Sequence, residues 1–133
     1  MDITLKSPSE IEKLRIVGAA TARVLEMIEP YVVPGVTTEE LDNIMNEYIQ
    51  TKENAVSADL GYQGYPKATC ISVNEVVCHG IPGPHKLREG DIVNIDVTVL
   101  KDKYYGDSSR MYIVGRTSPR NEQLCKCAQE AMY

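Results

Sequence analysis

The sequence predicts an α+β fold in which two amphipathic helices cover an antiparallel sheet. Two helix-start motifs, each followed by an apolar stripe, occupy the first 50 residues, and a run of β-branched residues bounded by turns follows in the second half. At 133 residues the chain is long enough for one domain with a hydrophobic core. The expected order of elements is helix, helix, strand, loop, hairpin and a final helix.

The first predicted helix begins after Ser7. Ser7 has the character of an N-cap, Pro8 suits the first helical position, and Glu10 is placed to complete a capping box. Apolar residues then recur at steps of three and four as far as Ile28, and the helix should end near Glu29-Pro30.

The segment Thr37-Thr38-Glu39-Glu40 repeats the capping-box signal for a second helix. Its apolar face consists of Leu41, Ile44, Met45, Tyr48 and Ile49. We expect both helices to be structural, covering a sheet rather than acting on a substrate.

Residues 68–73 have the pattern of a strand, and a last amphipathic segment begins at Asn121. That segment reaches Tyr133 without a C-cap signal, so we expect the chain to be truncated in a helix.

The stretch from Ile92 to Tyr112 is a β-hairpin pattern that carries two aspartates. If residues 101 and 102 form the turn, Asp96 lies opposite Asp107, and carboxylates about 4.5–5.5 Å apart at Cβ can ligate the same cations. Centring the turn on residues 102 and 103 would instead pair Asp96 with Ser109 and remove this argument. A structural alternative places Asp96 at an exposed edge and lets Asp107 cap the turn at Gly106.

Composition limits the class of partner. The chain has 14 Lys and Arg against 19 Asp and Glu, a net charge of −5, and no basic run, which argues against nucleic acid or an anionic membrane as the main partner. It has no apolar stretch of transmembrane length and no signal-peptide layout at its start, so we expect a cytoplasmic protein. Its four cysteines form no CxxC pair and are expected to be reduced thiols.

His79 lies between a strand-like segment and a Gly-Ile-Pro turn. A single loop histidine is ordinarily a surface or core residue, but beside the aspartates it could hydrogen-bond a scissile amide and shuttle a proton. The loop of residues 61–66 presents Tyr62 and Tyr65 and is either a packed surface turn or part of a pocket.

Three segments, residues 70–82, 90–99 and 106–111, closely resemble type I methionine aminopeptidases of the bacterial kind. The resemblance covers essentially the whole chain, including residues 10–15 and the loop of residues 61–66. It implies half of a pita-bread (creatinase/aminopeptidase) fold, with residues 1–133 as the N-terminal half of the catalytic domain. The implied activity is metal-dependent hydrolysis that removes the initiator methionine from nascent proteins when the second residue is small.

The resemblance also assigns roles by position. It implies that Asp96 and Asp107 are metal ligands, that His79 contacts the substrate amide, that Tyr62, Tyr65 and Cys70 line the methionine pocket, and that Asn74 and Val76 are backbone ligands of Na⁺ or K⁺. The divalent ions would be Co, Mn, Fe or Zn, two in a complete site. The implied partner is a nascent peptide N-terminus, with association at the ribosome left open.

Two features depart from the family pattern. Asp59 stands where bacterial enzymes often have a pocket cysteine, so we expect a more polar pocket rim. The remaining ligands, a histidine and two glutamates, belong to a second half, and Glu122 and Glu130 do not match them by motif. We therefore expect only part of an active site. The alternative is a non-catalytic fragment, or a module that binds a peptide N-terminus or a metal and pairs with a second half or with itself.

Overall fold

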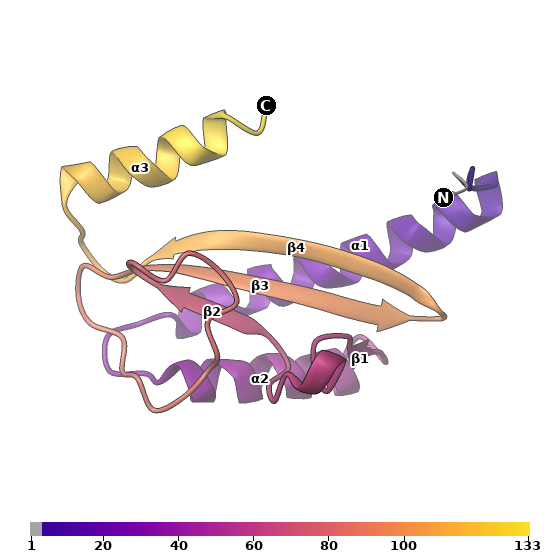
Figure 1. The fold of residues 1–133 in the computed structure, drawn as a ribbon, viewed down its shortest axis with the longest axis horizontal. Helices are drawn as coiled ribbons and strands as arrows, with labels where there is room; N and C mark the ends of the chain where they lie inside the picture. The colour runs from indigo at the N-terminus through magenta and orange to yellow at the C-terminus, as the bar shows by residue number, and fades with distance from the viewer. Residues whose placement is uncertain (1–3) are drawn as a thin grey trace.

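The computed structural model describes residues 4–133 (Figure 1). The helices are α1 (Pro8–Ile28), α2 (Thr38–Thr51) and α3 (Pro119–Glu130), with short 3-10 turns η1 (Glu29–Tyr31) and η2 (Tyr62–Gly64). The strands are β1 (Val56–Ser57), β2 (Cys70–Val73), β3 (Ile92–Lys101) and β4 (Tyr104–Ile113). Residues 1–3 lie outside the described part. They belong to the segment for which the sequence predicts no signal peptide.

Both predicted capping boxes are present. Ser7 accepts a hydrogen bond from the Glu10 N–H at the start of α1, and Glu10 accepts one from the Ser7 N–H at 2.8 Å. Thr37 and Glu40 make the same reciprocal pair at the start of α2. The helix α1 ends at Ile28, which agrees with the predicted end near Glu29-Pro30, and the chain continues as η1.

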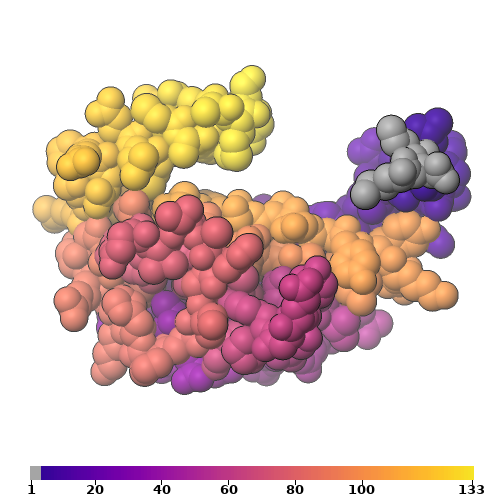
Figure 2. Space-filling view, viewed as in Figure 1, coloured from indigo at the N-terminus to yellow at the C-terminus, as the bar shows by residue number. Residues whose placement is uncertain are grey.

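The strand β2 begins at Cys70, two residues after the predicted start, and α3 begins at Pro119, two residues before its predicted start. The helix α3 ends at Glu130, with Ala131 at its C-cap, so it does not run to Tyr133. That the chain is truncated stays a prediction. No residue of α3 is buried, and Figures 1 and 2 show this helix standing apart from the body of the protein.

The sheet is antiparallel and is built around β3, which pairs with β2 and β1 along one edge and with β4 along the other. Val93, Ile95, Val97 and Val99 of β3 are buried in a core shared with α1 and α2. These two helices lie along one face of the sheet (Figure 1), so the predicted α+β class and the covered sheet are confirmed.

The predicted hairpin register is wrong. The turn consists of Asp102 and Lys103, both with positive φ (50° and 71°), so Asp96 pairs with Ser109 and Asp107 pairs with Thr98. Two positive φ angles give the turn the backbone twist that a two-residue hairpin favours. The two registers differ by two residues along β4 and leave every side chain on the same face, so the hydrophobic alternation could not distinguish them.

Among the helices of residues 4–133, none combines the length and the apolar character needed to cross a membrane.

Candidate active site

The face of the sheet that points away from α1 and α2 carries the two aspartates. Asn94, Asp96 and Thr98 of β3 point to this face, because the residues between and beside them, Val93, Ile95, Val97 and Val99, are buried in the core. The register places Cys70 of β2 beside Asp96, and it places Asp107 of β4 beside Thr98. Asp96 and Asp107 are therefore diagonal neighbours on one face, a relationship in which Cβ atoms lie about 7–8 Å apart or somewhat less.

The carboxylates on this face repel one another. Burial raises the pKa of Asp96, and the negative charges of Asp107 and Asp59 raise it further, whereas His79 lowers it. Burial likewise raises the pKa of Asp59. The hydrogen bond from Thr98 and the charge of His79 lower that pKa, and the charge of Asp107 raises it. Asp59, Asp107 and His79 are thus near enough to Asp96 for their charges to act on its carboxylate, and a cation between Asp96 and Asp107, which share a face, would relieve their repulsion.

The donor set fits a divalent metal only in part. Carboxylate oxygens are suitable ligands for hard and borderline divalent ions, and Asp96 and Asp107 share a face. Within residues 4–133, however, no three His, Cys, Asp or Glu side chains are grouped so that they could hold a metal ion. The two aspartates can supply two ligands, and the others must come from elsewhere.

His79 is exposed and has a left-handed backbone, with φ of 55°. The next residue, Gly80, is held against β2, because its N–H donates to Ser72 Oγ at 3.1 Å and its carbonyl accepts from the Ile71 N–H at 2.9 Å. A Cβ on Gly80 would lie 2.2 Å from the Ile71 carbonyl oxygen, so only glycine fits. The other histidine, His85, is exposed further along the same loop.

A cavity of about 440 Å³ has Asp59, Tyr62 and Thr98 in its lining, whereas neither Asp96 nor Asp107 lines it. Of the three predicted pocket residues, only Tyr62 lines this cavity; Tyr65 and Cys70 do not. Asp59 does, with its Oδ2 accepting a hydrogen bond from the Thr98 N–H at 3.3 Å. The cavity therefore has a carboxylate in its wall.

Tyr65 and Cys70 are more enclosed than Tyr62. The Tyr65 hydroxyl lies 3.0 Å from both the Thr69 and the Gly80 carbonyl oxygens, and burial raises its pKa. Cys70 is only 8% exposed, and burial raises the pKa of its thiol as well. Both groups are thus in their neutral forms at neutral pH, and the Tyr65 hydroxyl already has backbone partners.

The side chain of Asn74 is fully engaged. Its Nδ2 donates to Asp91 at 2.9 Å, its Oδ1 accepts from the Ile92 N–H at 3.1 Å, and its own N–H donates to the Ile92 carbonyl. The Val76 N–H donates to Val73. The predicted role of Asn74 and Val76 as backbone ligands of a monovalent cation stays a prediction.

Sequence reasoning missed the polar residues of α2 that lie beneath the site. Thr38 and Asp42 are buried, 3% and 4% exposed, and both bind loops that lead to the site. The spacing contained a signal: Thr38, Asp42, Met45 and Ile49 follow one another at helical steps along the buried face. A carboxylate on an otherwise apolar stripe requires hydrogen-bond partners.

Residues 12–133 match the family described as Metallopeptidase family M24. An antiparallel sheet with helices on one face and an acidic pair on the other is consistent with that match. The chain belongs to this family of metallopeptidases.

Within the family, the chain is similar to methionine aminopeptidases. It is 60% identical to the methionine aminopeptidase of Escherichia coli strain K12 over 134 aligned residues, which cover 100% of this chain and 51% of that protein. The crystal structure of methionine aminopeptidase from Rickettsia prowazekii superposes with a TM-score of 0.96 at 44% identity, covering 98% of this chain and 52% of that one. The chain thus spans about half the length of the curated relatives it matches.

A more distant structure supports the fold alone. The prolidase from Pyrococcus furiosus superposes with a TM-score of 0.79 at 20% identity, covering 96% of this chain and 36% of that one. With these neighbours, the predicted half of a pita-bread fold is confirmed.

Proposed function

We propose that residues 1–133 form the N-terminal half of a methionine aminopeptidase catalytic domain, which removes the initiator methionine from nascent proteins when the second residue is small. The observation that carries this proposal is the 60% identity to the Escherichia coli enzyme over the whole chain. The shared face of Asp96 and Asp107 supports it, because it gives the two aspartates of the family motif a common position. The partner would be a nascent peptide N-terminus, at or near the ribosome.

In this proposal Asp96 and Asp107 hold the divalent ions, Co, Mn, Fe or Zn, of which a complete site has two. When bound, such ions would polarise the scissile carbonyl. His79 would hydrogen-bond the scissile amide and hold or release a proton there, for which its exposed position is suited. The four cysteines are free, which is consistent with a cytoplasmic location.

The methionine side chain would lie against Tyr62, Tyr65 and Cys70. Tyr62 is 66% exposed and lines the cavity, so it can contact a ligand with its ring. Because the Tyr65 hydroxyl has two backbone partners, Tyr65 would contribute its ring rather than its hydroxyl. A thioether packs well against aromatic edges and sulfur. The Na⁺ or K⁺ ligands would be the carbonyls of Asn74 and Val76.

A second candidate is a non-catalytic fragment or a module that binds a peptide N-terminus or a metal. The non-catalytic fragment is favoured by one observation, that the described residues contain no group of three or more metal-ligating side chains. Such a chain could pair with a second half or with itself. The strand β4 lies at an edge of the sheet, where strand pairing with another chain is available.

A methionine-release assay distinguishes these functions. The chain is incubated with Mn²⁺ or Co²⁺ and the peptide Met-Ala-Ser, and free methionine is measured beside an Asp107→Asn variant. Release that depends on Asp107 supports the aminopeptidase. Release no greater than that of the variant overturns activity of this polypeptide, and sedimentation of the same sample then shows whether it self-associates.

A further inference from the structure

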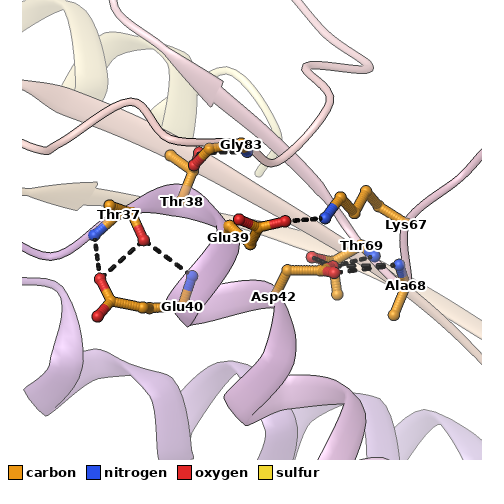
Figure 3. Close-up of polar contacts among 9 residues, drawn as sticks. All are labelled: Thr37, Thr38, Glu39, Glu40, Asp42, Lys67, Ala68, Thr69 and Gly83. Atoms are coloured by element: carbon orange, nitrogen blue, oxygen red, sulfur yellow. Dashed lines mark hydrogen bonds and ion pairs between the residues drawn. The ribbon is translucent and has the colours of Figure 1, made fainter.

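The first turn of α2 binds the segment that follows His79 (Figure 3). Thr38 Oγ1 accepts a hydrogen bond from the Gly83 N–H at 2.9 Å and donates to the Gly83 carbonyl at 3.1 Å. That carbonyl also accepts from the Glu39 N–H, and the Thr38 N–H donates to the His85 carbonyl, both at 3.0 Å. A helix start leaves four N–H groups without partners inside the helix. The loop therefore supplies hydrogen-bond partners for the first turn of α2, and these bonds hold the loop in place.

The same helix also binds the segment that leads into β2 (Figure 3). Asp42 Oδ1 accepts hydrogen bonds from the Ala68 N–H at 3.1 Å, and from the Thr69 N–H and hydroxyl at 2.8 Å. At the surface, Lys67 and Glu39 form an ion pair at 2.5 Å. Two segments that are distant in sequence are thus fixed by one helix end.

Tyr65 joins these two segments. Its hydroxyl lies within 3.0 Å of the Thr69 carbonyl on one side and the Gly80 carbonyl on the other. The residue directly after His79 is thus bonded both to Tyr65 and to β2, and three residues further on the chain is bonded to Thr38.

We propose that Thr38, together with Tyr65, positions His79. Thr38 holds Gly83 and Tyr65 holds Gly80, which fixes the short segment 80–83 and with it the left-handed backbone of His79. A non-glycine residue adopts positive φ at a cost and keeps it only where the surroundings enforce it. The catalytic meaning of this arrangement rests on the proposed function, but the positioning itself does not.

The test follows His79 by NMR in the whole chain. The protein has two histidines, so the imidazole ¹H–¹⁵N spectrum is simple, and a His79→Gln variant assigns it. In Thr38→Val we expect the Gly83 amide to exchange roughly tenfold faster, as the loss of a hydrogen bond implies, and the His79 imidazole signals to shift or split. Thr38→Ser keeps the hydroxyl and should restore the wild-type His79 signals.

The matched control is Thr51→Val, because the Thr51 hydroxyl bonds only within α2, to the Glu47 carbonyl at 2.8 Å. It should leave the His79 signals unchanged. Unchanged His79 signals in Thr38→Val, or equal changes in Thr51→Val, would overturn the proposal.

A second pair of variants keeps the proposal testable if Thr38→Val does not fold. Tyr65→Phe removes only the hydroxyl that bonds Gly80, whereas Tyr62→Phe removes a hydroxyl that bonds the Gln63 side chain at 3.3 Å. We expect the His79 signals to change in the first and not in the second, and the reverse result overturns the proposal. These NMR spectra do not depend on catalysis, so they test the positioning of His79 even if the chain releases no methionine. Failure of the proposed function and failure of this proposal are therefore distinguishable.

Discussion

Asp107 lies diagonally across the β3–β4 hairpin from Asp96, because its direct partner is Thr98, two residues further along β3. Both aspartates point to the face that the helices leave open. Burial and then the charge of Asp107 raise the pKa of Asp96, so the pair is strained electrostatically without a cation. This relationship leads directly to a prediction about metal binding.

Removing either carboxylate should weaken metal binding. We expect Asp96→Asn and Asp107→Asn each to lower Mn²⁺ affinity by at least about tenfold, since loss of even an outer-shell partner has effects of that order. Titration calorimetry with Mn²⁺ measures it. Asp102→Asn in the exposed turn is the control, because asparagine tolerates the left-handed backbone there. Equal affinities in all three variants would show that the aspartates are not ligands.

Close contact between α1 and β4 fixes the backbone next to Asp107, and glycine substitutions can test it. A Cβ on Gly106 would lie 2.6 Å from Thr21 Oγ1 and 2.7 Å from the Val17 carbonyl. We expect Gly106→Ala to lower the free energy of unfolding by about 1–3 kcal/mol through overpacking. Gly18→Ala, at a helical site with open space around it, should instead raise it by about 0.5–1 kcal/mol. Urea unfolding of the two variants measures both, and effects of the same sign would contradict the packing.

Much of this fold could be predicted from local chemistry. The capping boxes of Ser7 and Thr37 are local in sequence, so the starts of α1 and α2 follow from a few neighbouring residues. The hairpin and its face were also predictable, but its register depended on the backbone of Asp102 and Lys103, a weak turn signal.

The site could be predicted only where a motif identified it. The hairpin pattern indicated Asp96 and Asp107, and the family resemblance added their roles and that of His79, which stay predictions. Thr38 and Asp42 were not identified, because their partners are 45 and 27 residues away in sequence. No local pattern specifies such a contact. A polar residue on a buried helical face indicates that a partner exists, without identifying it.

Asp42 and Glu53 should respond to pH in opposite directions. Burial raises the pKa of Asp42 above its unfolded value of about 3.9. The folded state then binds the proton more tightly, so the contribution of Asp42 to stability is complete below about pH 3.9 and is lost as the pH rises through the folded pKa. Asp42→Asn remains neutral. The free energy of unfolding of wild type minus that of Asp42→Asn should therefore fall from pH 3 to pH 7, as measured by urea titration.

Glu53 provides the opposite case. Its hydrogen bonds from Arg23, at 2.8 and 2.6 Å, lower its pKa. Its contribution is present above the unfolded value of about 4.3 and is lost as the pH falls through the folded pKa. The free energy of unfolding of wild type minus that of Glu53→Gln should therefore rise with pH. It should reach about 2 kcal/mol at neutral pH, as charged hydrogen bonds imply. If the two differences change with pH in the same direction, the assignment of these shifts is wrong.

Asp59 should influence metal binding through its charge alone. Its carboxylate acts on Asp96 and Asp107 electrostatically and bonds the Thr98 N–H, but it has no place among the expected ligands. We expect Asp59→Asn, which keeps an acceptor for Thr98, to reduce Mn²⁺ affinity by about two- to fivefold, as loss of one nearby screened charge implies. That reduction should largely disappear in 1 M NaCl, where the screening length is about 3 Å.

Asp59→Ala separates the charge from the hydrogen bond. It should reduce Mn²⁺ affinity to the same extent as Asp59→Asn, and it should also lower the free energy of unfolding by about 1 kcal/mol, because the Thr98 N–H loses its acceptor. Calorimetry and urea unfolding of both variants measure the two effects. A loss of affinity that persists in high salt would instead identify Asp59 as a direct ligand, and it would change how this site differs from those of the bacterial relatives.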